Sequence, residues 1–407
     1  MADQVTARCC IAGGGPAGMM LGHLLARAGI DVLVLEKHAD FLRDFRGDTI
    51  HPSTLELMHE LGALRDFLAL PHQEVRQLGA TVGGVSIPIA DFGHLPTHCR
   101  FIAFMPQWDF LNFLAARSAR YPAFRLWMRA EVTDVIEEGG RIAGLRVLTE
   151  RGTQEVRADL VVAADGRHSA VRERAGMRVR DLGAPMDVLW FRLSRKQDDP
   201  ADTMGYFDPG RIFITINRGD YWQCGHVIAK GRGEALRREG IEAFRARLAA
   251  IAPFVGDRVG ELSSWDDVSL LTVAVDRLER WYRPGLLCIG DAAHAMSPIG
   301  GVGINLAIQD AVAAANLLAG PLRAGRVAVE DLARVEQRRL WPTRVTQWLQ
   351  VVAQRRVIAA VLGGRVPGRP ALLLRLLARF PILRRIPARL VGIGVRPEHI
   401  RSPEARG

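Results

Sequence analysis

The chain has 407 residues, of which 48% are hydrophobic and 24% are charged. This composition is typical of a globular protein with a substantial core and excludes a largely disordered chain. The length exceeds that of most single domains, yet no internal repeat and no Ser/Gly-rich or Pro-rich linker divides the chain, which predicts two interwoven domains. The five cysteines are scattered without a Cys-x-x-Cys pair and no secretory signal precedes them, so we expect reduced thiols in a cytoplasmic protein.

The formal net charge of +10 is concentrated at one end of the chain. Residues 321–407 contain 18 arginines, no lysine and 5 acidic residues, a net charge of +13, so the first 320 residues carry a net charge of −3. A basic surface spread over the whole molecule is therefore excluded. An anionic partner, if there is one, is expected at the C-terminal segment.

The first predicted element is a short buried strand, residues 9–12, which leads through Gly13-x-Gly15-x-x-Gly18 into an apolar helix. In such a unit the first glycine permits a tight turn, the second lets the backbone approach a pyrophosphate, and the third lets helix and strand pack closely. The next strand ends at Glu36, about 20 residues further on, where a carboxylate binds the ribose hydroxyls of an adenosine and disfavours a 2′-phosphate. The unit predicts a dinucleotide site that suits NAD and FAD equally.

A second buried strand, residues 160–164, runs into Asp165-Gly166-x-x-Ser169 and a basic helix start at Arg172. Taken alone, this motif is also compatible with a plain turn between a strand and a helix.

The region between residues 186 and 230 has the pattern of a different domain. Its segments alternate apolar and polar residues, are rich in aromatics and are separated by glycine turns, which predicts antiparallel strands. We expect the earlier segments 79–92 and 99–105 to join the same sheet. Residues 234–254 follow it as a predicted helix with a polar outer face.

The last motif repeats the order of strand, turn and helix. A buried strand, residues 286–289, is followed by Gly290-Asp291 and by a loop with three glycines that enters a helix of small residues, 305–318. A carboxylate at a strand end can bind a polyol, and the N–H groups at a helix N-terminus suit an anionic ring edge. This pairing favours the ribityl chain and ring of a flavin over a nicotinamide.

The three motifs, completed by His294, Pro298, Asn305 and Asp310, resemble in order and spacing those of the single-component flavoprotein monooxygenases, the p-hydroxybenzoate hydroxylase family. The resemblance covers about residues 7–320. It implies an α/β fold in which a Rossmann-like FAD-binding domain of the glutathione reductase type is interleaved with an antiparallel-sheet substrate domain. The implied limits are 1–73, 106–178 and 270–320 for the FAD-binding domain, 74–105 and 179–269 for the substrate domain, and 321–407 for a basic, helical C-terminal segment.

The same resemblance assigns further residues. Arg46 and Gln107 match positions that contact FAD, with Arg117 near the latter, and His168 matches a position that contacts NAD(P)H. Ser53 departs from the pattern, because many members have arginine there. The complete set of expected cofactor contacts is Gly13, Gly15, Pro16, Ala17, Gly18, Glu36, Lys37, Arg46, Gln107, Asp165, Gly166, His168, Asp291, Pro298, Gly301, Gly303, Ile304 and Asn305.

The resemblance also implies the reaction. Because the chain has a single dinucleotide fingerprint, NADPH or NADH is expected to meet the flavin transiently at the protein surface. Reduced FAD then takes up O2 as a C4a-hydroperoxide, which transfers one oxygen atom to an apolar, aromatic or polycyclic substrate. We expect the loop 298–303 to lie against the flavin edge, with Pro298, Gly300 and Gly301 as the catalytic residues.

Other interpretations remain open at this stage. A flavin reductase that saturates an alkene shares the scaffold, and so does a non-catalytic flavin-binding protein at a membrane surface. A flavin halogenase is disfavoured because the Trp-x-Trp-x-Ile-Pro signature is absent. No metal site is expected, since the pair His94-x-x-x-His98 has Pro96 inside it and cannot share a helical face. The acid or base that activates the substrate cannot be assigned from spacing. Tyr206, Tyr221, Trp222 and His226 are candidates, but core packing is the favoured role for each.

The C-terminal segment consists of apolar helices with interleaved arginines, broken by prolines. No run in it reaches the ~18 uninterrupted apolar residues of a spanning helix, so we do not expect an integral membrane protein. The segment suits either peripheral contact with an anionic bilayer or helices packed on the FAD-binding domain with arginine heads in water. Nucleic-acid binding is not expected, because the segment has few aromatics for stacking. A monomer and a homodimer both remain open.

Overall fold

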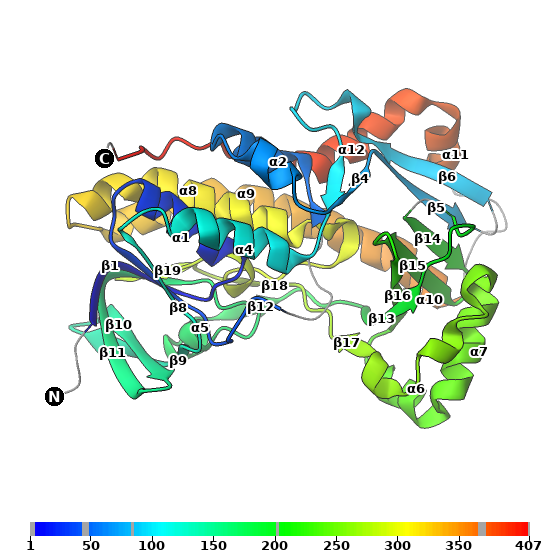
Figure 1. Ribbon diagram of the computed structural model, residues 1–407, viewed down its shortest axis with the longest axis horizontal. Helices are drawn as coiled ribbons and strands as arrows, with labels where there is room; N and C mark the ends of the chain where they lie inside the picture. Colours follow the sequence, from blue (N-terminus) through cyan, green and yellow to red (C-terminus); the bar gives the residue numbers. More distant parts are fainter. Residues whose placement is uncertain (1–4, 43–48, 83–84, 201–202, 365–371, 406–407) are drawn as a thin grey trace.

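The computed structural model describes residues 5–42, 49–82, 85–200, 203–364 and 372–405. Two sheets lie toward opposite ends of the molecule, and the long helices α8 (Gly303–Arg323) and α9 (Val329–Ala353) run from the first toward the second (Figure 1). The α/β fold with an interleaved antiparallel sheet, expected from the sequence, is confirmed.

The first sheet has a parallel centre. β1 lies between β2 and β11, β20 pairs with the far side of β11, and β8 with that of β2, all in parallel. Residues 9–12 of β1 are fully buried, as a parallel strand covered on both faces requires. The strands are β1 (Val5–Ala12), β2 (Val32–Leu35), β8 (Phe124–Trp127), β9 (Glu131–Glu138), β10 (Arg141–Thr149), β11 (Gly152–Ala163), β19 (Tyr282–Arg283) and β20 (Leu286–Cys288).

Helix α8 belongs to the core beside this sheet. By length and composition alone, the stretch Ile299–Arg323 could cross a membrane, but 67% of its most apolar window is buried inside the protein. α8 packs against α1 (Pro16–Arg27) on one side and α9 on the other, and α1 in turn packs against α4 (Gln107–Ser118). Small residues on α8, such as Ala311 and Ala314, permit this close approach.

The second sheet is antiparallel except for one parallel pair, β14 with β5. As expected, the segment 79–92 contributes strands to it. The order is β17 (Ser269–Leu271), β13 (Met186–Ser194), β16 (Tyr221–Ala229), β15 (Arg211–Asn217), β14 (Met204–Asp208), β5 (Gln77–Val82) and β6 (Val85–Asp91).

Two expectations about this region are wrong. The segment 99–105 does not join the sheet: β7 (Ile102–Phe104) pairs with β3 (Thr49–Ile50) and β4 (Gln73–Val75), because a 3-10 turn at Phe92–His94 leads the chain away from β6. The single helix expected over 234–254 is divided into α6 (Gly233–Glu239) and α7 (Ile241–Ile251). Gly240 separates them with a φ of 89°, which a glycine adopts without strain.

The C-terminal segment packs on both parts of the molecule. α9 lies along α8, whereas α11 (Leu372–Arg379) and α12 (Arg385–Gly392) contact β6. The last described residues return to the C-terminal end of α1, where the Ala405 N–H donates to the Arg27 carbonyl at 2.9 Å. The domain limits given above stay a prediction.

Candidate active site

The three sequence motifs meet at one edge of the first sheet. They follow β1, β11 and β20, and these neighbouring parallel strands end side by side, with Ala12 opposite Ala163 and Ala163 opposite Cys288. A Cβ atom on Gly13 would lie 2.4 Å from the Ala164 carbonyl oxygen. A Cβ on Gly290 would lie 3.1 Å from the Cβ atoms of two alanines, one on α1 and one on α8. Turns that are far apart in sequence are therefore in direct contact.

The first turn leaves space for a ligand at the start of α1. Gly13 has a φ of 103°, which favours glycine. A Cβ on Gly18 would lie 2.0 Å from the carbonyl oxygen of Gly13, so both positions require glycine. Gly15 has no atom within 4 Å of its Cβ position. α1 begins at Pro16, with no side-chain cap and no acidic residue in its first turn. The positive end of the helix is thus available to an anion.

Glu36 is tied to this turn. Its carboxylate, only 7% exposed, accepts hydrogen bonds from the N–H groups of Gly14 and His38, each at 3.0 Å. The neighbouring Lys37 is exposed and Ala17 is buried. The acid therefore lies directly beside the glycine turn, as the fingerprint predicts.

The second motif is linked to the third by an arginine. Ser169 accepts a hydrogen bond from the Arg172 N–H at 3.0 Å and caps α5 (Ala170–Arg174). The Arg172 guanidinium donates to the Ala292 carbonyl at 3.2 Å, next to Asp291. His168 is exposed.

Partial burial shifts the pKa of two carboxylates of these motifs. Burial raises the pKa of Asp165, against the hydrogen bond from Ser169, and its Oδ1 atom is buried without a partner. Burial also raises the pKa of Asp291, and the positive charge of Arg167, 3.6 Å away, opposes this shift. The Asp291 side chain is 33% exposed and can still reach a ligand.

The glycine loop before α8 is built from left-handed backbone. Gly300 has a φ of 77° and Gly301 a φ of 62°. A Cβ on Gly301 would lie 2.4 Å from the hydroxyl of Thr49, which donates to the Gly301 carbonyl at 2.9 Å. α8 begins at Gly303 and Ile304 without a side-chain cap or an acid in its first turn, so a second positive helix end is available near Gly290.

Asn305 clamps this loop to the segment 49–54. Its Oδ1 atom accepts hydrogen bonds from the His51 N–H at 2.9 Å and the Thr54 hydroxyl at 2.7 Å, and its Nδ2 atom donates to the Thr49 carbonyl at 3.1 Å. The side chain is 5% exposed. Its amide is engaged within the protein.

A buried ionic network supports the third motif, and the sequence interpretation gave its members no role. Asp310 accepts hydrogen bonds from His294 Nε2 at 2.5 Å, Arg339 Nε at 2.8 Å and the Gly290 N–H at 3.1 Å. Burial alone would raise the pKa of Asp310, but His294 and Arg339 outweigh it and hold the pKa below its usual value. Arg339 Nη1 also lies 3.4 Å from Glu398. The single acid of a mainly apolar helix was the signal that could have revealed this network, since a buried charge requires a partner.

The remaining candidates lie elsewhere. Gln107 begins α4 and is partly exposed, and Arg117 pairs with Asp66 at 3.3 Å. Arg46 lies outside the described residues. Trp222 and the ring of His226 face α6 and α7, and burial lowers the pKa of His226 to about 4. In the described part of the chain, no group of three or more His, Cys, Asp or Glu residues could hold a metal ion.

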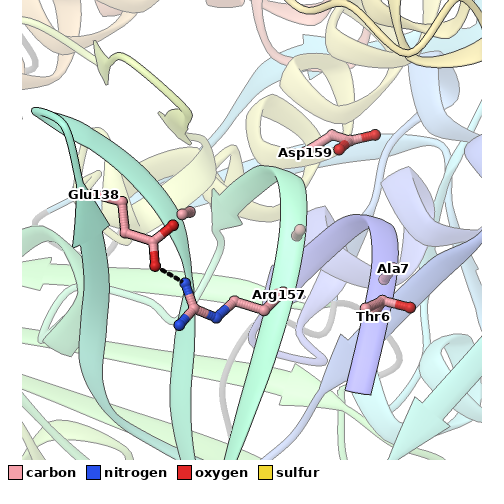
Figure 2. Close-up of a pocket in the computed structure, with 7 residues that line it drawn as sticks. Thr6, Ala7, Glu138, Arg157 and Asp159 are labelled. Atoms are coloured by element: carbon pink, nitrogen blue, oxygen red, sulfur yellow. Dashed lines mark hydrogen bonds and ion pairs between the residues drawn. The ribbon is translucent and has the colours of Figure 1, made fainter. Parts of the chain in front are cut away.

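Two cavities accompany the first sheet. The one in Figure 2, of about 420 Å³, is lined by Thr6, Arg157 and Asp159 at the beginning of β1, the opposite end from the glycine turns. The other, of about 370 Å³, is lined by Trp127 and neighbouring residues of β8, β10 and β11. It adjoins the first motif, because the Glu36 N–H donates to the Trp127 carbonyl at 2.8 Å.

Comparison with known proteins places these features in context. Residues 6–348 match the model of the FAD binding domain family. A 6-methylpretetramide 4-monooxygenase of Streptomyces rimosus is 34% identical over 395 residues, which are 95% of this chain and 93% of that protein. A rifampicin monooxygenase of Rhodococcus hoagii is 28% identical over 332 residues, 74% of this chain and 61% of that protein. Among solved structures, the anhydrotetracycline hydroxylase OxyS of Streptomyces rimosus aligns over 97% of this chain and 77% of its own, with a TM-score of 0.75 and 25% identity.

Proposed function

Because this chain belongs to the FAD binding domain family and is an FAD-dependent monooxygenase that consumes NAD(P)H, we propose that its substrate is an apolar, polycyclic aromatic molecule. The proposal depends on a flavin site, which is supported by the meeting of three turns at one sheet edge, between two uncapped helix N-termini. The substrate class is supported by relatives named for 6-methylpretetramide, rifampicin and anhydrotetracycline.

The residues at this edge fit FAD. The open space at Gly15 and the N-terminus of α1 suit its pyrophosphate, and Glu36, beside the 370 Å³ cavity, suits the ribose and adenine. The partly exposed carboxylate of Asp291 suits the ribityl hydroxyls. When bound, FAD supplies the hydride and oxygen chemistry that protein side chains lack. The extensive internal bonding of Asn305 supports an indirect role, in which it holds the loop that meets the ring.

The loop 298–303 provides the reaction environment. Its backbone and the positive end of α8 would stabilise negative charge that develops at the ring edge, which is the role we propose for Pro298, Gly300 and Gly301. Ile299 packs against apolar residues of the second sheet and helps exclude water. The exposed position of His168 suits a transient encounter with NADPH or NADH.

The test is an isotope experiment with the FAD-loaded enzyme. The protein is incubated under 18O2 with NADPH or NADH and with each member of a panel of phenols, quinones and polycyclic aromatics. The masses of the products are measured by mass spectrometry. We expect one 18O atom in the product and consumption of reductant that the substrate stimulates. A product that has gained two hydrogens and no oxygen under anaerobic conditions would instead favour the alkene reductase.

We also propose peripheral contact with an anionic membrane through α11, α12 and the turn between them. Phe380, Ile382 and Ile386 are 48%, 64% and 60% exposed, and exposed arginines such as Arg385 and Arg389 lie in the same segment. Residues 337–397 include no acid, so an anionic surface fits this face better than a second copy of the chain. The cytoplasmic location stays a prediction.

Vesicle flotation tests this contact. Binding to phosphatidylglycerol-containing vesicles should weaken by about 1 kcal/mol, roughly fivefold, for each arginine removed in Arg385→Gln/Arg389→Gln. The matched variant Arg232→Gln/Arg238→Gln removes the same charge from the region of α6 and should bind as wild type. Equal binding to neutral phosphatidylcholine, or a dimer that Ile386→Ser dissociates, would refute the contact.

A further inference from the structure

The second sheet has one covered face and one partly open face. Side chains such as Phe191 and Phe213 pack against α6 and α7 on the covered face. The other face carries Trp190, Phe207 and Ile214 on β13, β14 and β15, and these side chains remain partly exposed although their strands lie within the sheet. Apolar surface that stays accessible in the middle of a sheet is a place where an apolar ligand can pack.

This open face points toward the proposed reaction site. Trp190 and Ile214 belong at once to two apolar clusters. The first cluster includes Ile299, in the loop where Gly300 and Gly301 lie. The second includes Val391 of α12, whose carbonyl oxygen lies 2.7 Å from His51 Nδ1. Trp190 therefore packs against one apolar cluster that the glycine loop also joins and against another that α12 also joins.

The indole nitrogen of Trp190 has no hydrogen-bond partner among the described residues. This Nε1 atom is buried. The six-membered edge of the ring lies against Gly225, the residue opposite Trp190 on β16, where a Cβ would come within 2.9 Å of the ring. Any side chain at position 225 would thus displace the indole. A buried donor without an acceptor is unfavourable, so a ligand that supplies an acceptor is stabilised at this position.

We propose that the Trp190 indole N–H recognises the substrate by donating a hydrogen bond to an oxygen on its ring system. This inference rests on the proposed function and makes its substrate class narrower. Because the indole N–H is only a donor, the substrate atom has to be an acceptor, such as a quinone carbonyl or a phenol oxygen. Because Trp190 packs against the same apolar cluster as Ile214 and Ile299, we expect the rest of the substrate to be apolar. Trp190 is a specificity residue for oxygenated polycyclic aromatics.

The experiment compares two probes that differ in oxygen. Binding of 1,8-dihydroxyanthraquinone and of anthracene to the FAD-loaded protein is followed by the change in flavin absorbance. Trp190→Phe keeps an aromatic ring and removes the N–H, so we expect five- to fifteen-fold weaker binding of the hydroxyanthraquinone and less than a twofold change for anthracene. The matched control is Trp265→Phe, which removes another buried and unpartnered indole N–H on the side of α6 and α7 and should change neither.

The outcomes separate this inference from the proposed function. If Trp190→Phe weakens the binding of both probes equally, Trp190 only packs and the inference is overturned. Equal affinity of wild type and Trp190→Phe for the hydroxyanthraquinone also overturns it, as does the absence of hydroxyanthraquinone binding to wild type. Gly225→Ala provides a second variant, which should displace the indole and lower the affinity for the hydroxyanthraquinone with FAD content unchanged. If Trp190→Phe behaves as expected but no 18O enters any product of the panel, the proposed function fails while the recognition role stands.

Discussion

Replacement of Arg339 by methionine tests the buried network beneath the third motif. The substitution keeps a long apolar stem and removes the guanidinium, whose Nε donates to Asp310 at 2.8 Å and whose Nη1 lies 3.2 Å from the Arg396 carbonyl and 3.4 Å from Glu398. Loss of one partner from a buried ion pair costs roughly 3–5 kcal/mol, because the remaining charge is left uncompensated. His294 and Arg338 remain to stabilise the two carboxylates, so we expect about 3 kcal/mol of lost unfolding free energy.

The assay is urea unfolding at several pH values. Arg339 helps to keep the pKa of Asp310 below its ordinary value, so its contribution is complete at neutral pH and disappears as the pH falls through the range where this carboxyl takes up a proton. The deficit of Arg339→Met should therefore be complete above about pH 4 and shrink as the pH falls below that value. Addition of Asp310→Asn should restore part of the loss at pH 7.

Arg338→Met is the matched control. This neighbouring arginine also pairs with Glu398, but its side chain is 31% exposed, and its loss should cost less than about 1 kcal/mol. The reasoning is refuted if Arg339→Met costs no more than Arg338→Met, or if its cost is the same at every pH.

Three further results are expected. Gly13→Ala should lose FAD binding and most of the soluble folded protein, since its Cβ would lie 2.4 Å from a carbonyl oxygen; a yellow, folded variant would contradict this. Asp291→Ala should weaken FAD retention roughly tenfold with little change in unfolding free energy, measured by flavin release, and unchanged retention would remove its assigned role. Burial lowers the pKa of His23, His51 and His226 to about 4, so each stays neutral in the folded state while the unfolded chain binds its proton below pH 6.5. The free energy of unfolding should then fall by about 2 kcal/mol per histidine between pH 7 and pH 5. Urea midpoints that do not change over this range would contradict this expectation.

The sequence predicted the three turns well because each depends on local geometry. Gly18 is fixed by its close approach to the Gly13 carbonyl oxygen within one strand, turn and helix, the left-handed backbone of Gly13 is local as well, and Glu36 follows at the spacing that the next strand imposes. The contact of Gly13 with the Ala164 carbonyl oxygen, by contrast, joins two turns that are far apart in sequence. The two wrong expectations, the pairing of the segment 99–105 and the single helix over 234–254, have physical reasons. A short buried strand such as β7 can pair with any nearby edge, and Gly240 divided a helix whose apolar pattern continued across it.

The sequence did not predict which residues that are far apart in the chain form hydrogen bonds and ion pairs with one another. Arg339 lies 29 residues after Asp310, and nothing in the intervening pattern shows that α9 turns back along α8 to bring them together. The side chain of Trp190 was likewise indistinguishable from a core residue, since only the packed structure reveals that its N–H has no acceptor.

The most direct test of the account is a crystal structure of the protein with FAD. We expect a single FAD with its pyrophosphate at Gly13–Gly18, its ribityl chain beside Asp291 and its ring edge against the loop 298–303. A ring more than about 10 Å from that loop, or a diphosphate bound away from the start of α1, would contradict the claim that the three turns form one flavin site.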